Sequence, residues 1–563
     1  MNKASRCVWL AMALLAGLAL AEDKKDKLLA QPPLGHQDFV PTPERPVGYR
    51  GDGSGIYPGA TPPIVFSDKT NVLWATTIPI VEKPGGWSHS PPLVVGKQVF
   101  ISAEPDSTLC LDADTGKILW RKALGLLQTT TECLAMHSGN DFSTASSDGQ
   151  ALYRLFCGRA ANSKASLSLL VSYDLQGGQR WLTEMKMPNG QPLRTDNLAS
   201  PLLVDGRLVV RLRHSGTADL IAYDAATGKV AWGPTKHKLD ELDGNPWGDG
   251  TDGGLVSISL GGRAIALTSG GLCIDPRTGR LMGKALAAQS GTGRGYNRLG
   301  LDIGRAWSVF NTPVARAQAD GSATVVFSGS DKQTFTGDAK SNSLTPTPPD
   351  ADVTAAPWSE KTFTEGIRVL ACRLSLGPDG QVRSEPLWPQ PASLVVRESG
   401  QLHPHASLCG DRIGLLHVKG QLGVVDLKTG RLLGKDFQPV YPCEYKTAHL
   451  KYDLKAPEVL AAMEEYVLDP QMVFGGKGEQ SFARMGRTVY ARTAVDSRGY
   501  LYLANRMHDV FVVELTDDGP KVVQKNVVAQ PVCFYSHAAP VPHGKRLYYR
   551  TWTKVYCFEE KAR

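Results

Sequence analysis

The chain has 563 residues, of which 42% are hydrophobic and 21% charged, and 58 are glycines. This composition excludes a disordered chain and predicts a large core interrupted by many turns. The formal net charge of +7 falls to +5 once Lys3 and Arg6 leave with the N-terminal segment described next. Such a small excess predicts neither a nucleic-acid partner nor a strongly charged membrane-binding surface.

The N-terminus has the pattern of an export signal. Lys3 and Arg6 precede an apolar run over 8–20, which is too short to span a bilayer. Small residues just before Glu22 suit a signal peptidase. We therefore predict that residues 1–21 are a cleaved signal peptide. The mature chain is expected to be periplasmic or secreted, without a transmembrane segment.

A proline-rich segment follows the predicted signal and fills 22–70. Eight prolines lie between 31 and 63, and proline favours extended backbone over helix. We expect a mobile tail over 22–27, and then a strap that runs extended along the outside of the folded domain.

The remainder, 71–563, is dominated by an internal repeat. Residues 90–120 and 200–232 share one pattern of apolar runs and turn residues, and part of this pattern recurs over 271–283 and 421–434. Each unit holds four short apolar runs rich in Val, Ile, Leu and Tyr, separated by glycine-containing turns. This is the pattern of four antiparallel strands, A to D.

The glycine of the A–B turn marks eight units. It lies at Gly96, Gly149, Gly206, Gly262, Gly321, Gly410, Gly499 and Gly544. The last unit supplies strands A to C only, and a matching strand D stands at 71–79. Because closure into a ring removes exposed sheet edges, we predict an all-β fold, an eight-bladed β-propeller closed by this N-terminal strand. The alternative is a seven-bladed propeller, in which one of these eight units does not form a blade.

The C–D turns carry an Asp, a Thr-Gly pair and a Trp in fixed order, as in LDADTGKILW (111–120) and YDAATGKVAW (223–232). This motif resembles the pyrroloquinoline-quinone-like (PQQ-like) repeat family. That family contains quinoprotein dehydrogenases and non-enzymatic propellers similar to the outer-membrane assembly scaffold BamB. The resemblance covers roughly residues 71 to 560 and implies the fold rather than the function.

In that family the motif's tryptophan packs between neighbouring blades. The resemblance implies this role for Trp74, Trp120, Trp181, Trp232 and Trp388. Gly283 and Gly434 replace the tryptophan in two units, where we expect looser contacts. The aspartates of the motif are expected to be turn residues rather than catalytic acids. They are Asp112, Asp224, Asp275 and Asp426. Most of the nine cysteines left after signal cleavage are interpreted as small buried apolar residues.

The A–B and C–D turns are tight, whereas the long segments are B–C or D–A connections. Because strands alternate in direction within a blade, all the long segments should open on one face. They include insertions at 331–366 and 435–488, the second with a predicted short helix over 456–467. This loop-rich face, with the channel mouth beneath it, is the expected binding site.

Polar residues just before or at the start of strand A should line that channel mouth. They are His89, Asn197, Asp252, Asn311, His403, His405, Arg492 and His537, with hydroxyl residues Ser90, Ser200, Thr312, Ser407 and Thr493. His403 and His405 would point the same way on a strand and form a candidate metal pair, the alternative being hydrogen-bonded channel histidines. Arg294, Tyr296 and Arg298 form a loop cluster suited to an anionic or sugar ligand, the alternative being loop solubility.

Several enzyme signatures are absent from the sequence, among them the GxSxG elbow, the HExxH helix and the phosphate-binding glycine loop. The adjacent cysteine pair and haem motif of quinoprotein alcohol dehydrogenases are absent too. We predict an exported, non-catalytic propeller that binds a protein or glycan partner through its loop-rich face, and no cofactor is identified from the sequence. One alternative is a quinone-dependent oxidoreductase with PQQ and calcium in the central channel. The other is a metal-assisted hydrolase or lyase.

Overall fold

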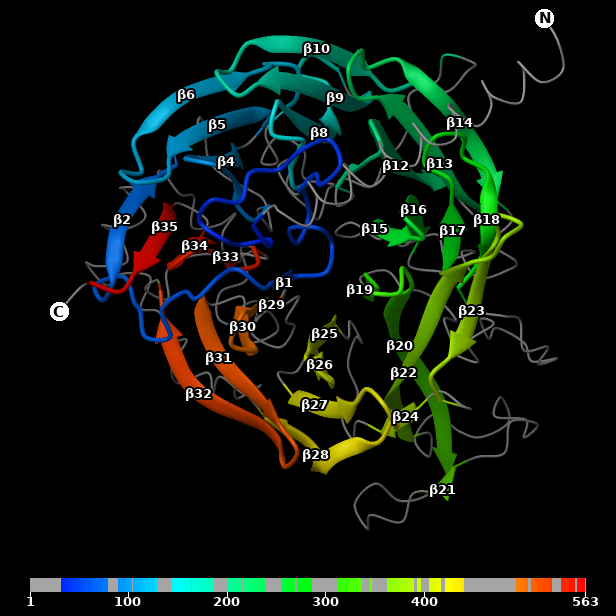
Figure 1. Ribbon diagram of the computed structural model, residues 1–563. Helices are drawn as coiled ribbons and strands as arrows, with labels where there is room; N and C mark the ends of the chain where they lie inside the picture. The colour runs from blue at the N-terminus through cyan, green and yellow to red at the C-terminus, as the bar shows by residue number, and fades with distance from the viewer. Residues whose placement is uncertain are drawn as a thin grey trace, which may run out of the picture.

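A computed structural model describes twenty stretches of the chain. They are residues 32–78, 90–103, 105–128, 143–163, 165–186, 190, 200–214, 217–237, 255–268, 271–285, 312–336, 345–346, 362–388, 392–395, 405–416, 421–439, 493–504, 508–528, 538–551 and 554–561. Within these stretches the strands form eight sheets around a central axis (Figure 1). The predicted eight-bladed β-propeller is therefore confirmed, and the seven-bladed alternative is wrong.

Blades 1 to 4 follow one another along the chain, each with strands in the order A to D. Blade 1 holds β3 Leu93–Val95, β4 Gln98–Ala103, β5 Ser107–Asp112 and β6 Ile118–Ala123. Blade 2 holds β7 Ser146–Ser147, β8 Ala151–Arg159, β9 Ser166–Asp174 and β10 Gln179–Glu184. Blade 3 holds β11 Leu202–Val204, β12 Arg207–His214, β13 Thr217–Asp224 and β14 Val230–His237. Blade 4 holds β15 Leu255–Leu260, β16 Arg263–Thr268, β17 Leu272–Ile274 and β18 Leu281–Lys284.

Blades 5 to 8 include strands from the insertions and from the N-terminus. Blade 5 holds β19 Val314–Ala317, β20 Ala323–Thr336, β22 Thr362–Leu376 and β23 Val382–Pro386, with β21 Thr345–Pro346 and β24 Ala392–Val395 at its sides. Blade 6 holds β25 His405–Cys409, β26 Arg412–Leu416, β27 Gln421–Asp426 and β28 Leu432–Pro439. Blade 7 holds β29 Thr493–Asp496, β30 Tyr500–Ala504, β31 Asp509–Thr516 and β32 Gly519–Val527, with β1 Ile56–Tyr57 beside β29. Blade 8 holds β33 Val541–His543, β34 Arg546–Arg550, β35 Lys554–Glu559 and β2 Val72–Thr77.

The hydrophobicity and burial of each strand's residues depend on how far the strand lies from the central axis. A middle strand such as β5 is covered on both faces by neighbouring blades, and its residues are buried almost throughout. An outer strand such as β6 mixes half-buried and exposed residues. Continuous apolar runs therefore mark strands B and C, and mixed runs mark strand D. The predicted helix over 456–467 lies outside the described residues.

The ring closes as predicted, through the first long strand of the chain. β2 pairs antiparallel with β35, with Val72 opposite Phe558 and Thr77 opposite Lys554. The strand that completes blade 8 thus comes from the opposite end of the domain, and no blade is left with three strands among the described residues.

Five blade contacts follow the predicted tryptophan geometry, which we call the Trp–Gly joint. The Trp74 indole Nε1 donates to the carbonyl of Ala113 in the next blade at 3.0 Å. A Cβ built on Gly116 would lie 2.6 Å from the Trp74 ring, so only glycine leaves room for it. The same pair of contacts recurs at Trp120, Trp181, Trp232 and Trp388.

The two glycine positions were expected to give looser contacts, and this prediction was wrong. At Gly283 the backbone of the next blade moves in, so that a Cβ would lie 2.5 Å from the carbonyl oxygen of Val382. At Gly434 a Cβ would lie 2.5 Å from the carbonyl oxygen of Asp518. Without an indole between them, the outer edges of the two blades pack backbone to backbone.

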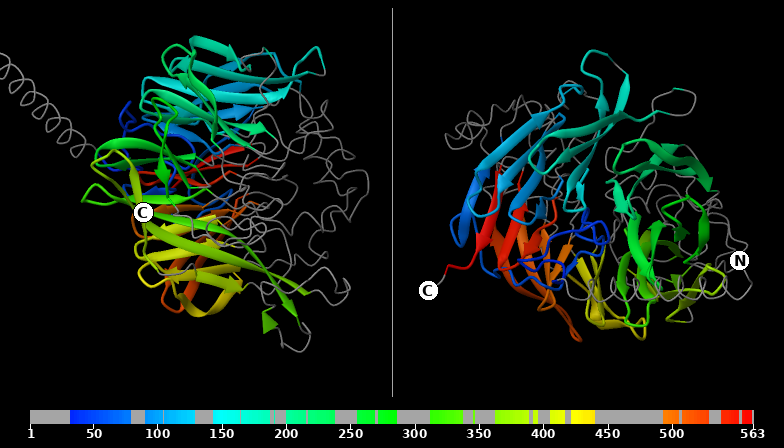
Figure 2. Two further views of the ribbon diagram at one scale, coloured as in Figure 1. Left: turned by 90° about the vertical axis from the view of Figure 1, so that its right-hand side faces the viewer. Right: turned by 45° about the horizontal axis from the view of Figure 1, so that its top comes forward.

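The first insertion begins as strands rather than as a loop. β20 and β22 continue past the ends of β19 and β23 and stay paired as far as Phe335 opposite Thr362. Figure 2 shows this hairpin projecting from the ring. The second insertion, predicted over 435–488, also begins in a strand, because β28 runs to Pro439.

Removing the indole at the ring closure should destabilise the whole propeller. Trp74 is buried, so Trp74→Ala leaves a cavity and should lower the free energy of unfolding by about 3–5 kcal/mol. Urea denaturation followed by circular dichroism measures this. The control is Leu73→Ala on the same strand, where the side chain is 44% exposed and the expected change is within about 0.5 kcal/mol. Equal losses in the two variants would contradict a Trp–Gly joint at the closure.

The glycine contact between blades 6 and 7 can be tested with a matched pair of alanine substitutions. Gly434 has φ +79° and Gly499 has φ +82°, so alanine meets the same backbone strain at both. Only at Gly434 does the added methyl meet a neighbouring backbone. Gly434→Ala should therefore cost about 1–3 kcal/mol more than Gly499→Ala in urea denaturation. Equal costs would show that the outer edges separate freely.

Candidate functional site

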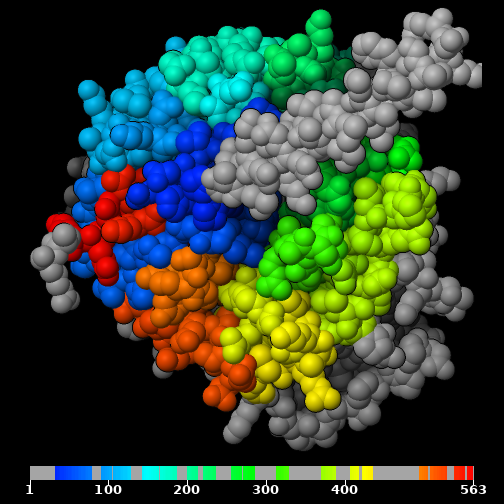
Figure 3. All heavy atoms as spheres, viewed as in Figure 1, coloured from blue at the N-terminus to red at the C-terminus, as the bar shows by residue number. Residues whose placement is uncertain are grey.

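The central channel has two unlike ends. The face with the A–B and C–D turns is here called the turn face, and the opposite face is the loop-rich face. On the turn face the N-terminal segment crosses the mouth of the channel (Figures 1 and 3). We call residues 33–61 the plug.

The plug was expected to run along the outside, and the structure corrects this. Its apolar residues Leu34, Phe39, Val47 and Tyr57 are all buried. An outer strap would leave these side chains in water, whereas the channel mouth removes them from it. The composition of the segment suggested a linker, but its apolar residues need a surface to pack against.

Backbone hydrogen bonds fix the plug to opposite sides of the ring. Ile56 and Tyr57 form β1, which pairs parallel with β29 of blade 7. Val47 forms a two-way bridge with Ser147 of blade 2, at 2.8 and 2.9 Å. Gly544, in the A–B turn of blade 8, accepts from Thr61 N at 2.7 Å.

The centre of the plug is a glycine-rich loop that enters the channel. Arg50, Gly51, Gly53 and Gly55 all have positive φ, which turns the chain back on itself. Asp52 at the tip is exposed although protein surrounds it, as expected for a side chain facing into a channel. Enclosure by protein raises the pKa of the Asp52 carboxyl group, against the hydrogen bonds that it accepts from Ser54.

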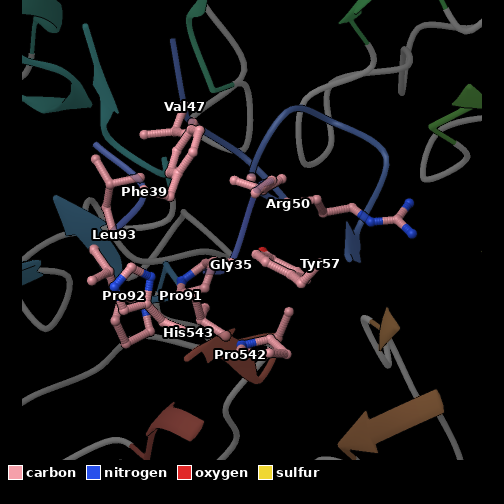
Figure 4. Close-up of a pocket in the computed structure, with 16 residues that line it drawn as sticks. Gly35, Phe39, Val47, Arg50, Tyr57, Pro91, Pro92, Leu93, Pro542 and His543 are labelled. Atoms are coloured by element: carbon pink, nitrogen blue, oxygen red, sulfur yellow. The ribbon is translucent and has the colours of Figure 1, made fainter. Parts of the chain in front are cut away.

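The plug leaves little free space at this mouth. A cavity of about 30 Å³ remains between the plug and blades 1 and 8, which is room for one or two water molecules. Figure 4 shows Phe39, Val47 and Tyr57 of the plug on one side of it, and Pro91, Pro92 and His543 of the ring on the other. No drug-sized ligand fits in a space of this volume.

The hydroxyl residues predicted at the channel mouth are all buried, and three of them bridge neighbouring blades. The five are Ser90, Ser200, Thr312, Ser407 and Thr493. Ser200 Oγ accepts from Thr144 N of blade 2 at 2.9 Å. Ser407 of blade 6 and Thr493 of blade 7 share a hydrogen bond of 2.5 Å. These groups therefore hold blades together, and they do not form an open polar surface.

The residues predicted to bind a ligand lie almost entirely outside the described stretches. These are His89, Asn197, Asp252, Arg294, Tyr296, Arg298, Asn311, His403, Arg492 and His537. The backbone of His405 is described and begins β25, opposite Leu416 of β26. The strand start predicted at His405 is therefore present, and the ligand and metal roles of all these residues stay predictions.

The motif aspartates are turn residues, as predicted. Asp426 Oδ1 accepts from both the backbone N and the Oγ1 of Thr429 at 2.7 Å. The side-chain bond from Thr429 is the largest cause that lowers the pKa of the Asp426 carboxyl group. Asp112 and Thr115 make the same two contacts. These carboxylates are used in closing the C–D turns.

Sequence reasoning missed Asp106, a fully buried carboxylate in the B–C turn of blade 1. Its two oxygens accept four backbone N–H bonds, from Leu124, Gly125, Leu126 and Leu127. Asp106 therefore fixes the start of a D–A connection on the loop-rich face. A single Asp between two strands looks like any solvated turn residue, so the sequence carried no signal for this role.

The part of the channel that the structure describes does not fit PQQ. The turn-face mouth is filled by the plug, and no group of three His, Cys, Asp or Glu side chains suited to a metal occurs in the described stretches. The described cysteines are buried and each belongs to a different blade. They are Cys110, Cys157, Cys273, Cys372, Cys409 and Cys557.

The fold defines an eight-bladed β-propeller with four-stranded blades. No protein-family model and no curated protein matches the chain. Among solved structures, BamB from Moraxella catarrhalis is similar over 86% of this chain and 100% of its own, at 11% identity and TM-score 0.42. A quinohemoprotein alcohol dehydrogenase from Comamonas testosteroni is similar over 92% and 81%, at 12% identity and TM-score 0.32. A europium-containing methanol dehydrogenase is similar over 84% and 90%, at 11% identity and TM-score 0.32.

At such identities a likeness concerns the fold alone and does not separate a scaffold from a dehydrogenase. In the described part of the chain, no helix has the length and hydropathy needed to cross a bilayer.

The seat of the plug contains one strongly perturbed histidine. Burial between the plug and blade 8 lowers the pKa of His543 to about 4, against a hydrogen bond with the backbone of Gln37. Arg546 and His36 lower this pKa further, and Asp38 raises it. The imidazole is therefore neutral where it contacts the plug at neutral pH.

This histidine gives the stability a definite pH dependence. Between about pH 6.5 and 4 the unfolded chain binds a proton at His543 that the folded chain does not, so stability falls as pH is lowered through this window. His543→Gln should flatten the slope of unfolding free energy against pH by up to about one proton. The control Lys545→Gln, at an exposed residue of the same A–B turn, should leave the slope unchanged. The same slope in His543→Gln and in the native chain would contradict the assignment.

Proposed function

We propose that this chain is an exported, non-catalytic propeller that binds a protein or glycan partner through its loop-rich face. The observation that carries the proposal is the extension of blade 5. Its inner strand β19 has 4 residues and its outer strand β23 has 5, whereas β20 has 14 and β22 has 15. The two middle strands, β20 and β22, thus extend beyond the inner and outer strands of their blade on the loop-rich face.

Backbone pairing makes this extension a defined support for the insertion. The pairs from Ser330 opposite Ile367 to Phe335 opposite Thr362 continue the blade's ladder without a bulge. β21 pairs with the tip of β20, and β24 pairs with β22 at Gly366–Val369. A paired platform that stands out from a ring suits a macromolecular partner, which contacts a broad surface, better than a small molecule.

The rest of the described chain favours a scaffold over a catalyst. The channel hydroxyls bridge blades, the motif aspartates close turns, and the plug fills one mouth of the channel. Each of these groups already has a structural task, which argues for binding at the surface. Export is supported by the signal pattern over 1–21, and the described cysteines expose no thiol to an oxidising compartment.

Shortening the first insertion should remove partner binding and spare the ring. Residues 337–361 are replaced by a short Gly-Ser linker, which keeps Phe335 opposite Thr362. We expect at least a tenfold loss of capture, measured with a glycan array and with pull-down from an extract of the exported compartment, and an unchanged melting temperature. The control changes two exposed lysines on the turn face, Lys97→Ala and Lys545→Ala. Full capture by the shortened chain, or its loss in the control, would contradict the proposal.

A further inference from the structure

We propose that the turn-face mouth of the channel is a peptide-binding site whose resident ligand is the plug, residues 33–61 of the same chain. We further propose that the plug can leave this seat while the ring stays closed. The ligand class is an extended, glycine- and proline-rich peptide with spaced apolar anchors. This inference is independent of partner binding on the loop-rich face.

The plug occupies the mouth as a bound peptide occupies a protein groove. Backbone pairing at β1 and at Val47 adds it to the inner edges of blades 7 and 2, which is the recognition mode of strand addition. Leu34 and Phe39, which precede these attachments, and Tyr57 of β1 are buried as anchors. Main-chain bonds supply affinity in this mode, and the side-chain pockets supply specificity.

Contacts with other blades complete the seat. Gly53 lies against Val256 of blade 4, where a Cβ would come within 2.9 Å of a Val256 methyl group. Gly149, in the A–B turn of blade 2, lies directly under the carbonyl of Pro41. Gly544, in the A–B turn of blade 8, lies under Gln37. The plug therefore touches the ring on several sides at once.

The plug is also closed on itself, so it can move as one unit. Gly59 N donates to the carbonyl of Leu34 at 2.9 Å and closes the base of the loop. Gly48 and Gly51 exchange two backbone bonds at 2.7 and 3.1 Å near its tip. These bonds stay within the plug and do not depend on the ring.

Ring closure belongs to a separate element. Two segments separate β2 from the plug. Residues 62–66 are held on blade 7 by Asn526, which accepts from Phe66 N and donates to the carbonyl of Ile64, both at 2.9 Å. A turn at 67–70 follows, in which Ser67 N donates to the carbonyl of Thr70 at 3.0 Å. Because β2 alone pairs with β35, the plug does not take part in the closing sheet. Release of the plug therefore leaves all eight blades complete.

The test uses two A–B turn glycines that differ only in the plug above them. Gly149 has φ +80° and Gly206 has φ +69°, so alanine strains both turns alike. The methyl of Gly149→Ala meets the Pro41 carbonyl, whereas nothing lies within 4 Å of a Cβ on Gly206. The reporter is Val256→Cys in both variants and in the native background, because Val256 is buried beneath the plug. Its reaction with a maleimide is measured at that site by peptide mass spectrometry.

We expect the labelling rate at position 256 to rise at least tenfold in Gly149→Ala and to stay at the native rate in Gly206→Ala. A circular dichroism spectrum like that of the native chain shows that the ring persists. Equal rates in the two variants would overturn the proposal, since the plug would then be fixed irrespective of this contact.

A second experiment does not depend on a substituted turn. A protease site placed in the 67–70 turn separates the plug from the ring after folding. A fluorescent synthetic peptide of residues 32–66, which keeps the contacts of Ile64 and Phe66 with Asn526, should then exchange into the nicked protein with saturable binding. Maleimide labelling at position 256 should fall as the peptide binds. Nicked protein that unfolds, or that never admits the peptide, would show that plug and ring are one inseparable unit and would overturn the proposal.

Discussion

The ring depends on how one blade meets the next. Most described joints use an indole lying on a turn glycine, and the geometry works only because the glycine has no Cβ. The hydrogen bond from each indole to a carbonyl of the neighbouring blade then fixes the angle between the two sheets. Where glycine replaces tryptophan, at Gly283 and Gly434, the backbones of the two neighbouring blades pack directly against each other.

The fold was predictable because its signals are local. Apolar runs, turn glycines and the Asp, Thr-Gly and Trp motif each occur within about fifteen residues of chain. The A–B turn glycine returns eight times, and the Asp and Thr-Gly of the motif return in four units. The match between 71–79 and the missing last strand required only a count of strands. These features predicted the number of blades and the closing pair Val72 and Phe558.

The errors concern contacts between segments far apart in the chain. Nothing near Gly434 in sequence shows that the carbonyl of Asp518 takes the place of an indole. Likewise, no residue close to Phe39 in the sequence indicates that its side chain is buried at the mouth of the channel. Asp106 was missed for the same reason, because its partners Leu124 and Leu127 follow a whole strand later. The candidate binding residues on the loop-rich face could be placed only by pattern, and they remain predictions.

The pairing of β2 with β35 has a consequence for how the protein is made. The two strands stand at opposite ends of the domain, so the last blade cannot form until the final residues have been synthesised. Until then blade 1 has no partner on one side, and β2 has no sheet to join. Unpaired strand edges of this kind are prone to wrong association. A chaperone would therefore have most effect during the interval between the synthesis of blade 1 and the arrival of the C-terminus.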